Sequence, residues 1–326
     1  MNKIKEIVYN LKAFDLVLVV FFIFLCTLDI IFRNVIPRWS EFILENVLII
    51  SSAFIIAWLE TTFKNRIWRI LHYWYIAPII LITFNQLYYM VGPIRHHDYD
   101  TLFIQIDRII FGTDPTMFLY KIANPFLTEL LQVIYGMYYT LPLILALVLL
   151  RKKRYFACDF AVFSIIYGFY LSYLGYFALP GIGPRFTIHN FANINTELPG
   201  IWLTKYLRDF TNVGEGIPNG TMNPAAVVQR DVFPSGHTMI TLIVIFLSIK
   251  LKSRSRYWLV PLGSLLIFAT VYLRYHYVVD LIGGFLFAAF SLWTGKMIFN
   301  WWRRVRGQTE FEYGRYSSDE REKATS

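Results

Sequence analysis

Long apolar runs that recur along most of the chain restrict its fold more than any other feature of the sequence. From about residue 14 to residue 300, stretches of roughly the length that crosses a bilayer follow one another. Helices satisfy their backbone hydrogen bonds within lipid, so this pattern is typical of a helical bundle. Because 56% of the 326 residues are hydrophobic and 16% are charged, the sequence predicts an all-α, polytopic transmembrane protein without a large soluble domain.

Eight crossings are expected. They fall approximately at residues 14–32, 41–59, 70–92, 129–150, 155–179, 238–251, 257–273 and 281–300. The first carries Asp15 and Asp29 and has no small-residue cleavage site behind it, which indicates a retained helix and not a signal peptide. The sixth is short, but Lys250 and Lys252 can extend their charged groups to the interface.

The distribution of basic residues predicts the orientation. The net charge is +9, but Lys and Arg occur in short clusters between apolar runs, which favours membrane topology over nucleic-acid binding. With both termini on one side, that side collects 21 of the 31 Lys and Arg residues. The positive-inside rule therefore predicts that the termini are cytoplasmic and that the loops 93–128 and 180–236 face outward.

The two outward loops differ in character. The first contains TLFIQIDRIIF and FGTDPTMFLYKIANPFL, which predict helical pieces along the interface, broken at Gly112 and Pro115. The second is rich in Gly, Pro and Asn. Its triplet NGT makes Asn219 a glycosylation acceptor in a eukaryotic secretory pathway, and fits a plain turn equally well.

The segment FPSGHTM, residues 233–239, stands directly before the sixth apolar run. Ser235 is expected to cap the helix that follows. The free amides of the first helical turn, including Gly236, and the positive end of the helix dipole then form a site for an anion such as phosphate. His237 is expected beside that anion.

A second histidine follows after two predicted crossings, one that enters the membrane from the outer side and one that returns to it. In LRYHYVVDLIGG, His276 and Asp280 are four residues apart, which stacks them on one face of a helix start, where the carboxylate can hold the imidazole tautomer. The predicted order of the crossings places His237 at the same outer surface. Arg185, in LPGIGPRF, and Arg274 are expected there too.

This set suits chemistry on a phosphate ester. Arginines and helix amides can neutralise phosphate oxygens without a metal, after which one imidazole attacks phosphorus and the other protonates the departing oxygen. We assign attack to His276, its orientation to Asp280, and the proton to His237. The groups expected to bind phosphate are Arg185, Ser235, Gly236 and Arg274.

No metal or cofactor is expected. RHHDYD at residues 95–100 places His96, His97, Asp98 and Asp100 close together, but adjacent side chains rarely face one ion, and a hydrated loop explains them better. Asn85 and Gln86 in the third crossing are explained more economically by hydrogen bonds within the bundle than by a polar path.

PSGH followed by HxxxD resembles the second and third signatures of the type 2 phosphatidic acid phosphatase superfamily, over about residues 129–300. The resemblance implies a six-helix core, activity without metal and a phosphohistidine intermediate. Two signatures depart from the pattern. Pro184 precedes Arg185 where the superfamily has Arg-Pro, Ala178 replaces a lysine, and Thr270 replaces an arginine.

These departures, with RYHYVVDLIGG and FGTDP, are similar to the branch that includes the fungal inositol phosphorylceramide synthases, which transfer headgroups between lipids. The expected parts are N-terminal helices with an interfacial loop (1–128), a phosphatase-like transmembrane catalytic domain (129–302) and a disordered cytoplasmic tail (303–326).

The predicted function is an integral membrane lipid phosphatase or phosphotransferase, with membrane lipids as partners and no nucleic acid. A headgroup transferase of the inositol phosphorylceramide synthase type is an alternative, because water or an alcohol can open a phosphohistidine. A non-enzymatic anion or lipid transporter is a second alternative, disfavoured because the charged set clusters at one edge of the membrane.

Overall fold

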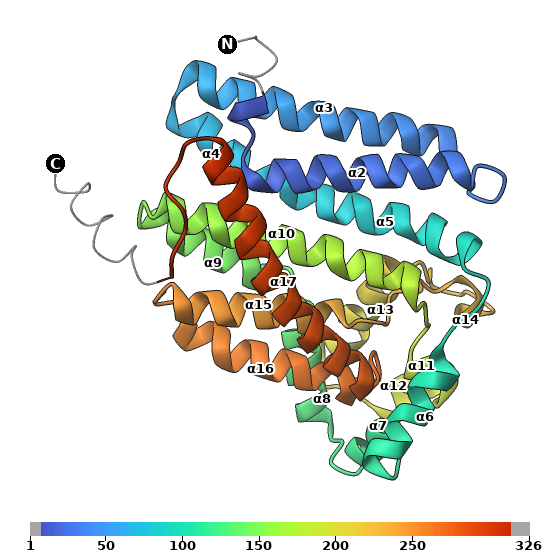
Figure 1. The fold of residues 1–326 in the computed structure, drawn as a ribbon. Coiled ribbons are helices and arrows are strands. Elements are labelled where there is room, and N and C mark those ends of the chain that lie inside the picture. The colour runs from blue at the N-terminus through green and yellow to red at the C-terminus, as the bar shows by residue number, and fades with distance from the viewer. Residues whose placement is uncertain (1–7, 314–326) are drawn as a thin grey trace.

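The computed structural model describes residues 8–313, and within that range the chain is all-α, as predicted. Most long helices run side by side (Figure 1). Five are long and apolar enough to cross a membrane: α2 (Ala13–Ile31), α3 (Trp39–Phe63), the consecutive α4 (Arg66–Trp74) and α5 (Ile76–Ile94) taken together, α10 (Tyr155–Ala178) and α17 (Val278–Val305). The chain is therefore an integral membrane protein.

The other three predicted crossings also coincide with apolar helices. α15 (Gly236–Lys250) and α16 (Arg256–Tyr272) are shorter than the rest. The crossing predicted as one helix at 129–150 is instead two, α8 (Pro125–Gly136) and α9 (Thr140–Arg151), bent by 54°. The break lets Tyr138 turn toward α15, where its hydroxyl donates to the Gly236 carbonyl at 3.1 Å.

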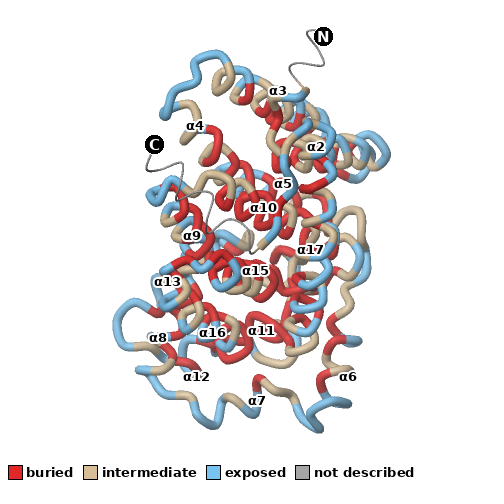
Figure 2. Tube along the Cα trace, turned by 60° about the vertical axis from the view of Figure 1, so that its left-hand side comes forward, coloured by how far each residue is buried: buried red, intermediate tan, exposed pale blue. Residues whose placement is uncertain are grey.

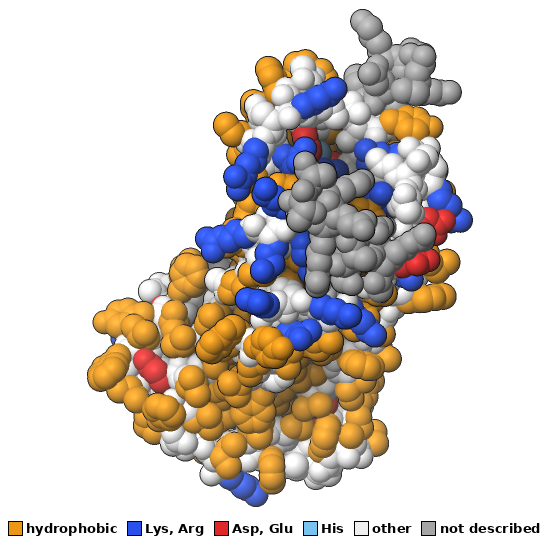
Figure 3. All heavy atoms as spheres, turned by 90° about the vertical axis from the view of Figure 1, so that its left-hand side faces the viewer, with side chains coloured by type: hydrophobic (Ala, Val, Ile, Leu, Met, Phe, Trp, Pro, Cys, Tyr) orange, Lys and Arg blue, Asp and Glu red, His pale blue; other side chains and the backbone are white. Residues whose placement is uncertain are grey.

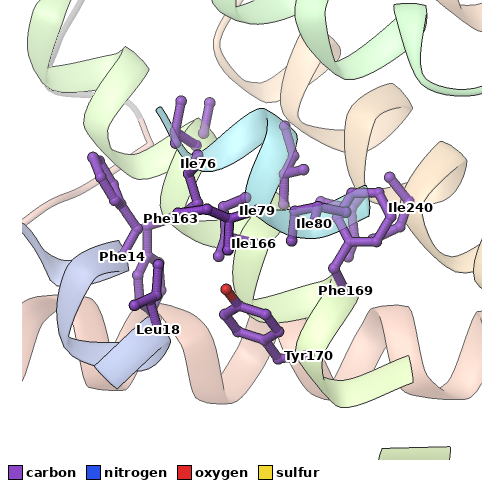
Figure 4. Packing of buried hydrophobic residues seen from close by; sticks show 14 of the residues in the cluster. Phe14, Leu18, Ile76, Ile79, Ile80, Phe163, Ile166, Phe169, Tyr170 and Ile240 are labelled. Atoms are coloured by element: carbon purple, nitrogen blue, oxygen red, sulfur yellow. The ribbon is translucent and has the colours of Figure 1, made fainter. Parts of the chain in front are cut away.

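α10 is the central helix. In its most apolar stretch 78% of the residues are buried, against 28–39% in the other four candidate spans. Those four helices therefore expose apolar faces that suit contact with lipid. α10 packs against α2, α5, α9, α15 and α17 (Figures 1 and 2). Figure 4 shows part of this core, in which Phe14 and Leu18 of α2 lie near Phe163 and Ile166 of α10.

Connecting segments gather at two ends of the bundle. Lys and Arg side chains gather at one of them (Figure 3), which we call the basic end; it contains residues 64–69, 151–154, 250–256 and 303–306. α2 begins and α17 ends there, and the two are joined where the Trp302 indole donates to the Leu11 carbonyl at 3.0 Å.

The opposite end, which we call the loop end, carries the two long loops. The first contains α6 (Asp100–Phe111) and α7 (Pro115–Tyr120), which confirms the helical pieces and their breaks, since Gly112 has a φ of 69° and Pro115 starts α7. The second contains α11 (Pro184–Thr187), the 3₁₀ helix η1 (Phe191–Asn193), α12 (Ile194–Glu197), α13 (Thr204–Gly214) and α14 (Pro224–Val227). Asn219 lies exposed in a turn.

The prediction that the tail at residues 303–326 is disordered is wrong for residues 303–313. α17 continues to Val305, and the chain then folds back so that Phe311 is fully buried and stacks on Phe160 with ring centroids 3.9 Å apart. Asn300 pairs with the Phe311 backbone in both directions, at 2.7 and 3.2 Å. Burial of this aromatic side chain offsets the cost of ordering the segment. Residues 314–326 lie outside the described range.

A buried polar network joins α2, α3 and α4 near the basic end. The fully buried His72 contacts Asp15 through Nε2 at 2.8 Å and Glu60 through Nδ1 at 2.5 Å. The Tyr75 hydroxyl donates to the second oxygen of Asp15 at 2.5 Å. Buried charge is tolerated inside a membrane protein only when it is paired, so this network fixes how the N-terminal helices pack.

We expect His72→Ala to destabilise the fold by about 3–5 kcal/mol, because it leaves the buried Asp15 carboxylate without its imidazole partner. Unfolding in detergent, followed by circular dichroism against denaturant, measures the change. His96→Ala, at an exposed loop residue, is the control and should leave the midpoint unchanged. Equal midpoints for the two variants would show that the network does not support the fold.

Candidate active site

The two histidines singled out by their motifs meet at the loop end. The ring centroids of His237 and His276 are 5.6 Å apart, and the ring planes are inclined by 60°. His276 is buried and His237 is partly buried. At this separation both rings can contact groups of one phosphate ester.

The starts of α15 and α17 are joined directly, and this junction brings the histidines together. The Ser235 amide donates to the Asp280 carbonyl at 3.0 Å. A side chain at Gly284 would place its Cβ 2.9 Å from the Ser235 carbonyl oxygen, and one at Gly283 would lie 2.6 Å from the Phe233 ring. Glycine is needed at both positions for α17 to approach the PSGH segment this closely.

Hydrogen bonds define which nitrogen of His276 is free. Its Nδ1 lies 3.1 Å from the Val232 carbonyl oxygen and 3.4 Å from the Asp280 carboxylate. Both neighbours are acceptors, so Nδ1 carries the proton and Nε2 keeps its lone pair. The same Asp280 oxygen accepts from the Tyr277 amide at 2.8 Å, which orients the carboxylate toward the imidazole.

The electrostatic environment keeps His276 neutral. Burial lowers its pKa to about 4; the Asp231 carboxylate and the Val232 carbonyl oppose this shift, and Arg185 adds to it. Burial raises the pKa of Asp231 to about 6, against the opposing charges of His276 and Arg185. At neutral pH the imidazole is therefore uncharged and able to act as a nucleophile.

Asp231 was missed in the sequence, although it immediately precedes the VFPSGH segment. An acidic residue in a loop gives no local signal of its partners, and only the fold shows that its charge acts on His276.

His237 sits between aromatic rings at the start of α15. It stacks on Tyr135 at a centroid distance of 4.6 Å and lies 4.1 Å from the Tyr138 ring. Ser235 caps the helix as predicted, its side chain accepting from the Thr238 amide at 3.2 Å. The amides of Gly236 and His237 belong to the first turn, for which a helix provides no internal acceptors.

Arg185 lies next to this aromatic stack. Its guanidinium group is 4.7 Å from the centre of the Tyr275 ring, which stacks in turn on Tyr135 at 4.3 Å. It forms an ion pair with Glu215 and donates to Asn212 at 2.9 Å. The structure thus brings Arg185 close to the histidines, but with a carboxylate already at its guanidinium group.

Arg274 points elsewhere. Its backbone carbonyl accepts from the Arg185 amide at 3.2 Å, but its guanidinium group pairs with Glu197 and lies 5.2 Å from the centre of the Tyr120 ring. Those contacts tie the end of α16 to α7 and α12. Its predicted contact with phosphate stays a prediction.

A cavity of about 380 Å³ opens at His237. Its polar lining includes Asp231, Glu215, Asn85 and Tyr176. Hydrogen bonds within the bundle were the expected role of Asn85 and Gln86. Asn85 instead borders this cavity. The buried Gln86 amide has no hydrogen-bond partner among the described residues. The cavity is large enough for a phosphate group and part of an organic substituent.

Two carboxylates of α6 hold the site from outside, and neither was predicted to do so. Asp107 accepts from the Val278 and Val279 amides at 2.8 Å each, which caps α17. Asp100 accepts from the Gly183 amide and the Tyr277 hydroxyl, both at 2.8 Å. Asp98, its neighbour in RHHDYD, pairs with Arg230 at 3.4 Å. Among the described residues no group of three or more His, Cys, Asp or Glu could hold a metal ion.

The fold is that of a helical membrane protein, and two histidines lie beside a cavity at its loop end. The family model of the PAP2 superfamily matches residues 103–294, more than half of the chain, so the chain belongs to the PAP2 superfamily. Membership points to an enzyme of the lipid phosphatase or phosphotransferase type. Comparison with curated proteins and with solved structures gives no significant match. The helices α2 to α5 lie outside the matched residues.

We expect Asp231→Asn to change the titration of His276. In the unaltered protein the ring signals of His276 should respond near pH 6, where Asp231 changes charge. The variant should lose that response and show a single, lower pKa, because the carboxylate that stabilises the imidazolium is gone. NMR of histidine-labelled protein in detergent measures both.

Glu41→Gln removes an exposed carboxylate at the start of α3 and should leave the His276 titration as it was. An unchanged or higher pKa of His276 in Asp231→Asn would contradict the assigned electrostatic interaction.

Proposed function

We propose that the protein is a lipid phosphatase or phosphotransferase that works through a phosphohistidine at His276. The observation that carries the proposal is the pair of imidazoles whose ring centroids are 5.6 Å apart. Nδ1 of His276 is directed at two acceptors, and its Nε2 has no hydrogen bond to the described residues. Superfamily membership supports the same reaction class.

In the first step Nε2 of His276 forms a bond to phosphorus, and the bond from phosphorus to the leaving oxygen breaks. His237 gives its proton to that oxygen. In the second step a water or alcohol oxygen attacks phosphorus, the N–P bond breaks, and His237 takes the proton of the attacking group. Asp280, through its contact with Nδ1, stabilises the positive charge that His276 develops.

The phosphate oxygens are bound by the start of α15 and by Arg185. The Gly236 amide and the Ser235 hydroxyl supply donors at the positive end of a helix dipole. Arg185 supplies a positive charge, although its guanidinium group also pairs with Glu215. Arg274 contributes less, because Glu197 holds its guanidinium group. The chemistry of these groups requires no metal.

The orientation follows from the charges. The basic end faces the cytoplasm, and the loop end, with the histidines, faces the extracytoplasmic side. The substrate is then a lipid phosphate ester of the outer leaflet.

Purified protein in detergent should release phosphate from a lipid phosphate in the presence of chelator. His276→Ala should abolish turnover, and His237→Ala should reduce it about 10²- to 10⁴-fold because the leaving oxygen loses its acid. Quenched reactions with labelled lipid phosphate should trap an acid-labile phosphoprotein in the unaltered protein. His97→Ala, at an exposed loop histidine, is the control.

The acceptor decides between the two enzymatic alternatives. Headgroup exchange onto ceramide or diacylglycerol without phosphate release would select the transferase. A His276→Ala variant with unaltered activity on any lipid phosphate or headgroup donor would exclude the mechanism, and lipid or anion movement without chemistry would select the transporter.

A further inference from the structure

A second, apolar cavity of about 290 Å³ adjoins the cavity at His237. Leu81, Tyr139 and Phe169 line both. The two cavities therefore follow one another between α5, α9 and α10, and we call them together the chain groove.

The chain groove runs along the helices and away from the histidines. On α10 the lining passes from Tyr176 through Phe169 to Val162, and on α5 from Asn85 through Leu81 to Ala77. α10 begins at the basic end and finishes at the loop end, so this order leads from the loop end into the bundle (Figure 1). At a rise of 1.5 Å per residue the stretch of α10 covers about 21 Å, more than half of a bilayer core.

The polarity of the groove changes along its length. Its outer part contains His237, Asp231 and Glu215. Its inner part is lined by apolar side chains, among them Ile76, Ile80, Ile166 and Phe169, which Figure 4 shows lying side by side on α5 and α10. Such a gradient matches a molecule with a phosphate at one end and a long hydrocarbon chain at the other.

The groove also borders the lipid-facing surface. Leu81 is 50% exposed and Tyr139 is 38% exposed, and both belong to faces of the bundle that contact the bilayer. A chain already in the membrane can enter sideways without passing through water.

We propose that the chain groove holds one hydrocarbon chain of the lipid substrate, so that the enzyme selects lipid phosphates with a long chain. The inference rests on the proposed function. A chain gains little free energy on moving from lipid to an apolar groove, so its effect lies in orientation, because a fixed chain holds the phosphate at His276. One wall is α5, which lies outside the residues matched by the PAP2 superfamily.

The test compares Leu143→Trp with Leu147→Trp. Both residues lie on α9 and are 36% exposed, but only Leu143 lines the groove, and it does so in the inner, apolar part away from the cavity at His237. Leu143→Trp should lower kcat/KM about tenfold for dipalmitoyl phosphatidic acid and leave dibutyryl phosphatidic acid unchanged. Leu147→Trp should alter neither substrate. Equal losses on both substrates, or none, in Leu143→Trp would overturn the proposal.

A second measurement separates this inference from the proposed function. Phosphatidic acid with a photoreactive group on its chain is bound to the inert His276→Ala variant, and the labelled peptides are mapped. Labels should concentrate within residues 76–81, 139–146 and 162–169, and dipalmitoyl but not dibutyryl phosphatidic acid should displace them. Labels spread evenly over lipid-facing helices such as α16 would overturn the groove, whether or not the unaltered protein turns over any lipid phosphate.

Discussion

The junction between the starts of α15 and α17 is the contact on which the site depends. One backbone hydrogen bond, from Ser235 to Asp280, and the close approach at Gly284 set the two histidines at a common point. Because each histidine stands in the first turn of its helix or just before it, neither can move without its helix. The geometry is therefore held by backbone packing, which is stiffer than a contact between flexible side chains.

Segments outside the two motifs reinforce this junction. α6 lies along the loop end and caps α17 through Asp107, while Asp100 holds Gly183 and the Tyr277 hydroxyl. A column of rings connects His237 through Tyr135 and Tyr275 to the guanidinium group of Arg185. The Thr270 carbonyl accepts from the Tyr275 and His276 amides at 2.9 and 3.1 Å and so fixes the turn that carries the histidine.

The N-terminal helices contribute beyond the region that defines the superfamily. Asp15, Glu60 and His72 lock α2, α3 and α4 together near the basic end. This network positions α5 beside α10, where α5 closes one side of the chain groove. Residues 103–294 thus supply the groups for the chemistry, and the helices α2 to α5 shape the space into which a substrate chain can fit.

The sequence by itself determined the all-α class, the apolar helices, the helix breaks at Gly112 and Pro115, the cap at Ser235 and the pairing of His276 with Asp280. Each depends on hydrophobic length, helix-start chemistry or a spacing of four residues, all of which are local. Only the tertiary structure decided that the charge of Asp231 acts on His276, that Arg274 turns to Glu197, that the fourth crossing bends and that Phe311 is buried. Those outcomes depend on which distant side chains pack together, and a one-dimensional pattern of polarity does not encode the partners of a charged group.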